Sequence, residues 1–405
     1  MKDFKKIKMA RTLFFVVILA TSLMLSACGL KKHKAIQPHK TSFDVINVKA
    51  IQNKRGIHQE WKTDTSQRII PLNELAVLLR RNAIRPLNNP RYITNNDAKG
   101  QMFGGQPVIA VEVEGQWYGI PINILSYHEI VNDSIGNTLF SVAYCPLCNT
   151  AYVLNRKLRY KNKDYVLKFG TTGMLRNSNL VMWDEQTETW WQHLTAEGVV
   201  GTLAGAKLEI MPAKIISLNN FWAFYPDGRT MLPDEDSDHL AQYNINPYPK
   251  YDSLGIHQPF LFFGEVDPRL PAMEYVIGLE NQGSRKAYPL SELKKLKVIN
   301  DKIGNKDVVL FYNADMISNL DTREIKNGKQ IGSGTVFNAS VDDRKLTFIA
   351  DKHGFKDNET GSTWNFVGRC TDGPLKGKSL TPEVYGLDFA FAYLAFYPEA
   401  VVFTK

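Results

Sequence analysis

The sequence predicts a mainly-β protein of the α+β class, made of two related, duplicated β-rich halves with short helices. Two observations predict this class. Blocks of similar sequence recur in the same order in the two halves of the chain, which is typical of an internal repeat. Most segments between turn residues are also short and rich in β-branched and aromatic residues, as strands are, whereas helical stretches are few.

Four pairs of matching blocks carry the repeat. Residues 121–137 align without a gap on residues 289–305, at an offset of 168 positions. The other pairs follow in the same order: 184–190 with 358–364, 201–205 with 373–377, and 221–226 with 393–398. This alignment places Trp190 opposite Trp364, which favours a packing role for both side chains.

Each half is expected to contain the same elements. In the first half, strands over 108–113 and 116–120 are joined by a turn at Glu114-Gly115, and a short helix begins at Pro121. A strand over 138–144 and a closing helix near 218–225 come next. The second half repeats these elements with a helix after Pro289, a strand over 307–312 and a closing helix near 388–397.

The chain is expected to divide into six segments. A further amphipathic helix is predicted over residues 72–81, where apolar residues recur at helical spacing. The six segments are a lipoprotein signal peptide (1–27), a basic tether (28–41), an N-terminal extension (42–100), the first repeat (101–226), a connector (227–270) and the second repeat (271–405).

The net charge of +8 is concentrated at one end of the chain. Residues 1–27 carry +4 and residues 28–40 another +4, so the rest of the chain is formally neutral. A neutral body offers no basic face to phosphates, and we therefore expect no nucleic-acid partner. With four cysteines among 405 residues, the chain is also not a disulfide-rich scaffold.

The first residues resemble a bacterial lipoprotein signal. A basic stretch precedes an apolar run over residues 12–25, which is shorter than the roughly 20 residues that span a bilayer. Small residues then lead to Cys28, as in a lipobox. The resemblance implies cleavage before Cys28 and its lipidation, so the membrane becomes a partner. Because Gly29 does not match an Asp retention signal, we expect a lipid-anchored envelope protein, in the outer membrane if present, facing the periplasm or cell exterior.

A repeat allows the two halves to be compared position by position. A chemically capable group found in one half only is a candidate for function. Cys145 faces Asn313, and His128 faces Leu296, while the pair formed with Cys148 has no counterpart. The first half alone also carries a Gly- and polar-rich segment that we interpret as a substrate-side loop. Its candidate residues are Gly170, Thr172, Arg176 and Ser178.

Three interpretations of Cys145-Pro-Leu-Cys148 remain open. Two thiols at this spacing can form a redox-active disulfide, with His128 as an acid–base group or thiolate stabiliser. The same two thiols with His128, or with His193, could bind copper or zinc. A structural disulfide, on a non-catalytic adaptor, is the third interpretation. A strand rather than a long helix is expected after the pair, which differs from a thioredoxin unit.

Several blocks resemble the bacterial domain-of-unknown-function family 3179. They are residues 124–133, Tyr144-Cys-Pro-Leu-Cys-Asn-Thr-Ala151, 169–183 and 184–208, and they cover most of residues 100–230. Some members of that family carry selenocysteine in place of one Cys of the pair. The resemblance thus implies a redox role for Cys145 and Cys148 in thiol–disulfide or related oxidoreductase chemistry, with an unidentified redox or protein partner in the envelope. Neither the residues nor the resemblance indicates a cofactor.

Overall fold

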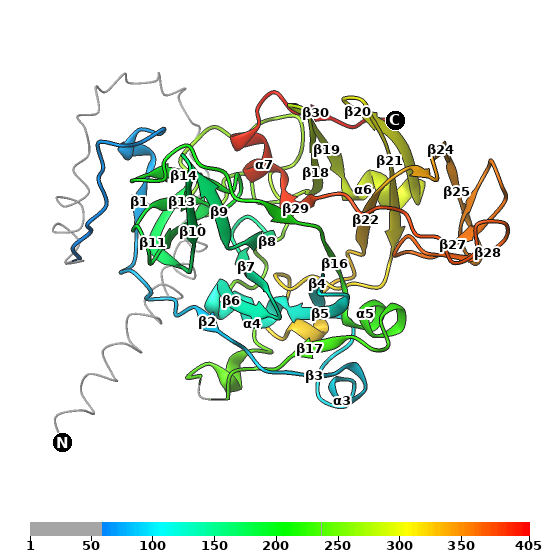
Figure 1. Ribbon diagram of the computed structural model, residues 1–405, viewed down its shortest axis with the longest axis horizontal. Helices are drawn as coiled ribbons and strands as arrows, with labels where there is room; N and C mark the ends of the chain where they lie inside the picture. Colours follow the sequence, from blue (N-terminus) through cyan, green and yellow to red (C-terminus); the bar gives the residue numbers. More distant parts are fainter. Residues whose placement is uncertain (1–58, 236) are drawn as a thin grey trace, which may run out of the picture. The chain divides into compact units, whose positions relative to one another are not determined.

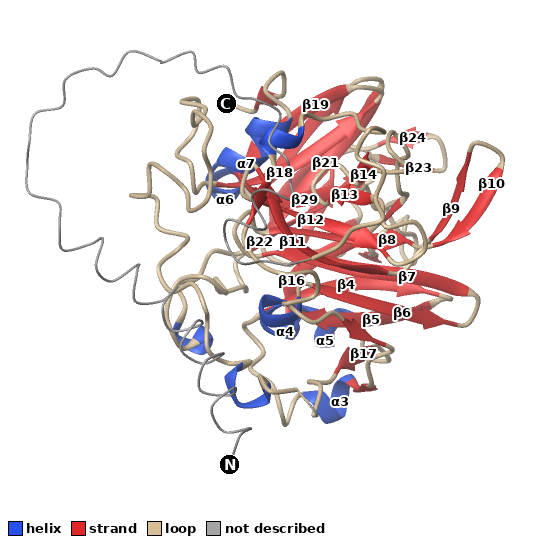
Figure 2. Ribbon diagram, turned by 90° about the vertical axis from the view of Figure 1, so that its left-hand side faces the viewer, coloured by secondary structure: helices blue, strands red, loops and turns tan. Residues whose placement is uncertain are grey.

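Short strands make up most of the regular structure, and the helices among the described residues are short (Figure 2). The protein is represented by a computed structural model, which describes residues 59–235 and 237–405. The predicted fold class, mainly β with short helices, is confirmed. The predicted signal peptide, the tether and Cys28 lie outside the described residues.

Three five-stranded sheets contain the strands of the first half, drawn in blue, cyan and green in Figure 1. The first is β16 (Ala213–Ser217), β4 (Pro107–Val113), β5 (Gln116–Pro121), β17 (Arg229–Met231) and β3 (Tyr92–Thr94). The second is β15 (Ile210–Met211), β8 (Thr150–Asn155), β7 (Thr138–Cys145), β6 (Ile130–Ile135) and β2 (Leu87–Asn88). The third is β1 (Ala76–Val77), β11 (Phe169–Arg176), β12 (Asn179–Asp184), β13 (Trp190–Gln192) and β14 (Glu197–Val200). A separate ribbon pairs β9 (Lys157–Tyr160) with β10 (Lys163–Val166).

Within the sheets of the second half, the strands follow one another in an order similar to that of the first half. The first sheet is β29 (Tyr385–Phe389), β18 (Tyr275–Asn281), β19 (Ser284–Pro289) and β30 (Val401–Val402). The second is β20 (Val298–Ile303), β21 (Lys306–Asn313) and β22 (Ser333–Asn338). The third is β25 (Phe348–Asp351), β26 (Gly354–Asp357), β27 (Thr363–Trp364) and β28 (Cys370–Asp372). A ribbon pairs β23 (Ser340–Val341) with β24 (Arg344–Lys345).

Turn residues with positive φ join the first strand pair of each half. Glu114 and Gly115 have φ of 51° and 76° between β4 and β5, while Gln282 and Gly283 have 50° and 79° between β18 and β19. Two consecutive positive φ values match the right-handed twist of the strands, and the second position in each turn is glycine.

Each half contains two short α-helices that pack on its first sheet. Pro121 and Pro289 precede the first of these, where a missing N–H costs nothing. Both helices end at a residue in the positive-φ region, Glu129 at 57° and Lys297 at 66°, and this backbone feature is therefore part of the shared scaffold. The helices are α3 (Asn95–Ala98), α4 (Ile122–His128), α5 (Leu218–Phe224), α6 (Leu290–Leu296) and α7 (Ala390–Phe396), with 3-10 turns η1 (Leu72–Glu74), η2 (Leu240–Gln242) and η3 (Ile325–Asn327).

Two expectations about local structure are wrong. Residues 72–81 do not form an amphipathic helix: only the turn η1 is helical, and β1 then pairs with β11. The N-terminal extension therefore supplies edge strands to the first-half sheets, and pairing with a neighbour outweighs local helix propensity.

The repeat alignment is also shifted by one residue around the tryptophans. Trp191, not Trp190, occupies the position of Trp364. Its indole Nε1 donates to Asp184 at 2.9 Å, and Trp364 makes the same 2.9 Å bond to Asp357. Both tryptophans are fully buried, so a packing role holds in either register.

The two halves share one hydrophobic core and contact each other reciprocally. β29 of the second half contacts β8 of the first, and β16 of the first contacts β22 of the second (Figure 1). The largest apolar cluster contains residues of both halves, among them Val142 and Leu310. The turn between β7 and β8, which carries both predicted site cysteines, therefore lies where the halves meet.

Candidate active site

The Cys145–Cys148 pair lies in a tight turn between two strands. β7 ends at Cys145, the amide of Cys148 donates to the Cys145 carbonyl at 3.2 Å, and β8 begins at Thr150. Asn149 has a φ of 53°, which reverses the chain into β8. The strand expected after the pair is present, and no helix opens at the cysteines.

The surroundings of Cys145 favour its thiolate. Burial alone would raise the pKa of Cys145, but hydrogen bonds from the Cys148 thiol and from the amides of Leu180, Cys148 and Leu147 outweigh burial and lower the pKa. The sulfur also lies 3.6 Å from the Ser178 carbonyl oxygen, which can accept a hydrogen bond from the protonated thiol. Both protonation states of Cys145 therefore have hydrogen-bond partners.

Cys148 has the opposite electrostatics. Burial raises the pKa of Cys148 well above its usual value, and donation to the Cys145 sulfur together with the negative charges of Cys145 and Asp388 raises it further. The Asn179 side chain acts in the other direction and is weaker. The turn thus holds two thiols whose pKa values are displaced in opposite directions.

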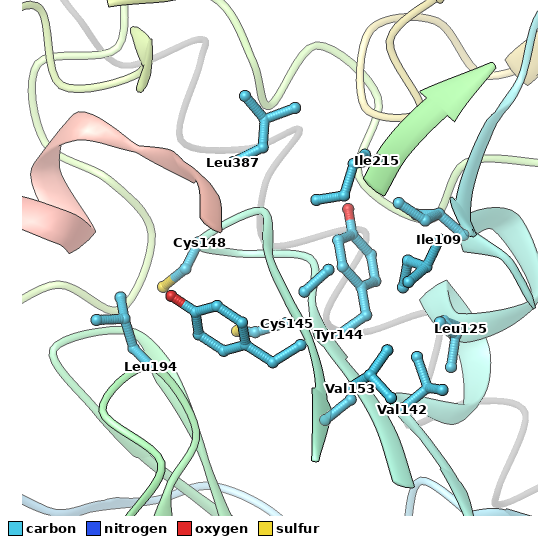
Figure 3. Close-up of a cluster of buried hydrophobic side chains, with 14 of the residues drawn as sticks. Ile109, Leu125, Val142, Tyr144, Cys145, Cys148, Val153, Leu194, Ile215 and Leu387 are labelled. Atoms are coloured by element: carbon cyan, nitrogen blue, oxygen red, sulfur yellow. The ribbon is translucent and has the colours of Figure 1, made fainter. Parts of the chain in front are cut away.

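Both sulfurs are shielded from solvent. Cys145 is 1% exposed and Cys148 is fully buried. Figure 3 shows the pair within a cluster of buried residues that includes Val142, Leu194 and Leu387. All three cysteines among the described residues, the pair and Cys370, are free thiols.

The connector lies against the turn. The Tyr251 hydroxyl donates to the Leu147 carbonyl at 3.1 Å, and the Ser178 hydroxyl donates to the Phe260 carbonyl at 2.7 Å. These bonds join the connector to the turn and to the β11–β12 hairpin.

His128 is not brought to the cysteines. Its Nδ1 lies 2.8 Å from the Arg85 carbonyl and its Nε2 lies 2.6 Å from the Tyr243 hydroxyl. Both ring nitrogens are therefore engaged by other groups, and neither is available to a thiolate or a metal. Burial lowers the pKa of His128. Its interactions tie α4 to the N-terminal extension and the connector.

The charge of Cys145 acts instead on Glu129, the next residue. The Glu129 side chain is buried, and burial, together with the charge of Cys145, raises its pKa well above the usual value. Both causes favour the protonated carboxyl of Glu129 over its carboxylate. The matching position in the second half is Lys297.

The predicted substrate-side loop is a β-hairpin, and only one of its residues reaches the pair. Ser178, at the turn, supplies the carbonyl next to Cys145. Arg176 pairs with Glu74 at 2.5 Å, Gly170 packs under Asn82 and Trp183, and the Thr172 hydroxyl bonds within the β11–β12 bulge. The last three residues therefore support the fold of the hairpin.

The second half contributes to the same site through β29. The amide of Phe389 donates to the Cys148 carbonyl at 2.8 Å, and the Asn149 side chain donates to the Leu387 carbonyl at 2.8 Å. The Thr150 hydroxyl donates to Asp388 at 2.6 Å. The turn is thus held in place by residues about 240 positions away along the chain.

Two residues of the site escaped the sequence comparison, although a signal for each was present. Glu129 follows His128 directly, and the same offset of 168 positions places it opposite Lys297, a residue of different chemistry. Asp388 faces Ile216 at the offset that aligns the closing helices, but it lies in the second half, where no site residue was expected.

No three His, Cys, Asp or Glu side chains within residues 59–235 and 237–405 are grouped so that they could hold a metal ion. His193, the other histidine considered as a ligand, is fully buried and packs edge-to-face on Tyr152. Burial lowers its pKa to about 3.

Within residues 59–235 and 237–405, no helix is both long and apolar enough to cross a membrane.

Comparison with known proteins yields one match. The model of a family described as a protein of unknown function (DUF3179) matches residues 81–400. No curated protein and no solved structure matches the chain.

Proposed function

We propose that this chain, which belongs to the DUF3179 family, is a thiol–disulfide oxidoreductase of the cell envelope whose reactive pair is Cys145 and Cys148. Because the family has no assigned reaction, the proposal rests on the site. The observation that carries it is the opposite displacement of the two thiol pKa values within one turn.

That displacement suits the two steps of disulfide exchange. The attacking group must be a thiolate, and three backbone amides and the Cys148 thiol stabilise the thiolate of Cys145. The second thiol must stay protonated until the mixed disulfide has formed, as the burial of Cys148 favours. A purely structural bridge has no need of hydrogen bonds to the thiolate of one partner.

The reaction balances as a two-electron exchange. The Cys145 thiolate attacks one sulfur of a disulfide substrate, the substrate S–S bond breaks, and one substrate thiolate leaves. Cys148 then loses its proton and attacks Cys145, which forms the Cys145–Cys148 disulfide and releases the second substrate thiol. The protein pair is oxidised, the substrate is reduced, and a dithiol reductant of the envelope restores the pair.

Substrate access depends on the connector in this proposal. Cys145 is 1% exposed, and the Tyr251–Leu147 and Ser178–Phe260 hydrogen bonds lie beside it. Both bonds are single contacts between a hydroxyl and a carbonyl, each with a net value of about 1 kcal/mol. Because Tyr251 and Phe262 are buried and the Tyr251 amide also donates to the Leu320 carbonyl at 3.1 Å, access requires a local opening that displaces more than these two bonds.

The location is proposed from the N-terminal residues. A lipobox-like sequence ending in Cys28 would anchor the mature chain in the envelope, with the tether between the membrane and the folded part. An oxidising compartment supplies the disulfides on which such a pair acts.

We also infer that the two halves arose by duplication. The matching order of strands in their sheets, the two positive-φ helix ends and the paired Trp–Asp hydrogen bonds support this inference. The site would then be an addition to one copy, since Asn313 occupies the position of Cys145.

The test is the reduction potential of the pair. The chain carries Cys28→Ser and Cys370→Ser, so that the pair holds the only thiols, and it is equilibrated with thiol–disulfide buffers. We expect a two-electron transition above about −300 mV and exchange with a small disulfide. Cys148→Ser should trap a mixed disulfide on Cys145, whereas Cys145→Ser should trap none.

A potential below about −300 mV without exchange would identify a structural bridge and contradict the proposal. Binding of added copper or zinc by the reduced pair, without exchange, would favour the metal interpretation instead. Full cellular function of the double Cys→Ser variant would favour the adaptor.

A further inference from the structure

We propose that Asp388 accepts the proton of the Cys148 thiol when that sulfur attacks Cys145. This inference rests on the thiol function proposed above and assigns a second-half residue to its second step. The proton passes from the Cys148 sulfur to the Asp388 carboxylate. The sulfur electron pair forms the bond to Cys145, and the bond between Cys145 and the substrate breaks, with its electrons leaving on the substrate sulfur.

The position of β29 brings the carboxyl group to the turn. The amide of Phe389 donates to the Cys148 carbonyl at 2.8 Å, and the Thr150 hydroxyl donates to Asp388 Oδ1 at 2.6 Å. Asp388 is fully buried, and its Oδ2 has no hydrogen-bond partner among the described residues. One carboxyl oxygen is therefore fixed, and the other is available to take a proton.

A glycine leaves room for that free oxygen. A Cβ atom at Gly386 would lie 2.4 Å from Asp388 Oδ2 and 2.8 Å from the Tyr152 hydroxyl. Residues 386 and 388 lie on the same face of β29, because side chains alternate along a strand. Any larger residue at 386 would push the carboxylate or the tyrosine away.

Burial brings the pKa of Asp388 close to pH 7, so that both the carboxyl and the carboxylate are populated at that pH. Burial raises its pKa to about 7, and the Thr150 hydrogen bond lowers it only in part. A base with a pKa near the working pH is the most effective proton acceptor. The titratable groups that face Asp388 are Cys148, Tyr152 of β8, and Tyr393 and Tyr397 on or beside α7, and all four have raised pKa values. On the neighbouring strand β18, Val276 is the residue paired with Asp388. The Glu280–Arg285 ion pair lies beyond the tyrosines, and both of its residues interact with Tyr393 and Tyr397.

Of the two halves, only the second carries a carboxyl group at this position, and its strand β29 is the one that contacts β8 beside the cysteines. Asp388 lies two residues before α7, and the residue two positions before α5 is Ile216. β16, which carries Ile216, contacts β22, where no cysteine pair exists. A buried carboxyl group is costly to maintain, and at this position of the two halves it is present only in β29, which contacts the strand that follows the cysteine turn.

The experiment separates the two chemical steps. A Cys28→Ser/Cys370→Ser chain is mixed with an aromatic disulfide that releases one coloured thiol when Cys145 attacks and a second when Cys148 closes the pair. Asp388→Asn should leave the first release intact, slow the second by about 100-fold at pH 7, and remove its pH inflection near 7. Asp357→Asn, a buried carboxyl group distant in sequence from the pair, is the control and should slow neither step selectively.

Thr150→Val supplies a second variant if Asp388→Asn does not fold. It keeps the carboxyl group but removes the hydrogen bond that lowers its pKa, so the inflection of the second release should move to higher pH. An unchanged second step in Asp388→Asn, or an unmoved inflection in Thr150→Val, would overturn the role of Asp388. Absence of both releases in the parent chain would instead contradict the proposed function.

Discussion

At the residue scale, one of the groups that lower the pKa of Cys145 is a side chain that can be varied, the Cys148 thiol. Cys148→Ala deletes the hydrogen bond to the Cys145 sulfur, whereas Cys148→Ser keeps a donor there. We expect the pKa of Cys145 to rise by about one unit in Cys148→Ala and by less in Cys148→Ser. Thiolate absorbance as a function of pH measures both, in a chain that lacks Cys28 and Cys370. Equal pKa values in the two variants would show that the backbone amides alone hold the thiolate.

Glu129 allows a test of its protonation state. Because burial and the charge of Cys145 raise the pKa of this carboxyl, we expect Glu129→Gln to replace one neutral group with another of similar shape. The pKa of Cys145 should then stay within about half a unit of its parent value. A fall of a unit or more would mean that a negative charge had been removed, and that Glu129 is ionised beside the thiolate.

At the element scale, the β11–β14 sheet positions the residues that face Cys145. Asp184 anchors this sheet through the Trp191 indole and the Thr187 amide, and Asp357 anchors the β25–β28 sheet in the same way through Trp364 and Thr360. Asp184→Asn and Asp357→Asn should each lower the free energy of unfolding by about 1–3 kcal/mol. Only Asp184→Asn should shift the pKa of Cys145, because only its sheet carries Ser178 and Leu180. Denaturation and thiol titration together check this, and an equal shift in both variants would contradict it.

The connector should limit access to the pair. Tyr251→Phe removes the bond to the Leu147 carbonyl, at a cost of about 1 kcal/mol in stability, and should raise the rate of reaction with a small disulfide several-fold. Tyr312→Phe is the matched control, since the Tyr312 hydroxyl donates to the Ile331 carbonyl in the second half. Stopped-flow rates decide the point. An unchanged rate in Tyr251→Phe would mean that substrates reach Cys145 by another route.

At the scale of the whole molecule, two buried groups oppose each other in the pH dependence of stability. Asp388, with its pKa raised from 3.8 to about 7, stays protonated in the folded chain, so the free energy of unfolding falls as pH rises through this range. His193, with its pKa lowered from 6.5 to about 3, stays neutral when folded, so stability falls as pH drops below 6.5. Each effect amounts to about 4 kcal/mol at most.

In Asp388→Asn, the pH dependence that His193 gives to the free energy of unfolding should therefore no longer be offset by Asp388. The variant's free energy of unfolding should rise with pH between about 4 and 6.5 more steeply than that of the parent chain, by up to about 4 kcal/mol across the range. Urea unfolding at a series of pH values measures the slopes. Parallel slopes for variant and parent would show that Asp388 does not titrate on unfolding.

Much of the fold followed from local patterns. The Glu114-Gly115 turn, the helix after Pro121 and the strand that ends at Cys145 all appear where the sequence predicted them, because turn chemistry and hydrophobic alternation act over a few residues. The helix predicted over 72–81 failed because β1 pairs with β11, a partner almost 100 residues away. No local pattern reports such a pairing.

The amino-acid sequence by itself determined the β-rich class, the position of the Cys145–Cys148 pair and the family, since composition, spacing and motif are properties of the chain alone. Which groups surround those cysteines was decided by the tertiary structure. The end of α4 turns His128 toward Arg85 and Tyr243 and brings Glu129 under the influence of the Cys145 charge, and β29 brings Asp388 from the second half. Side-chain direction and the packing of distant strands set these neighbours, and both arise only when the halves close on a common core.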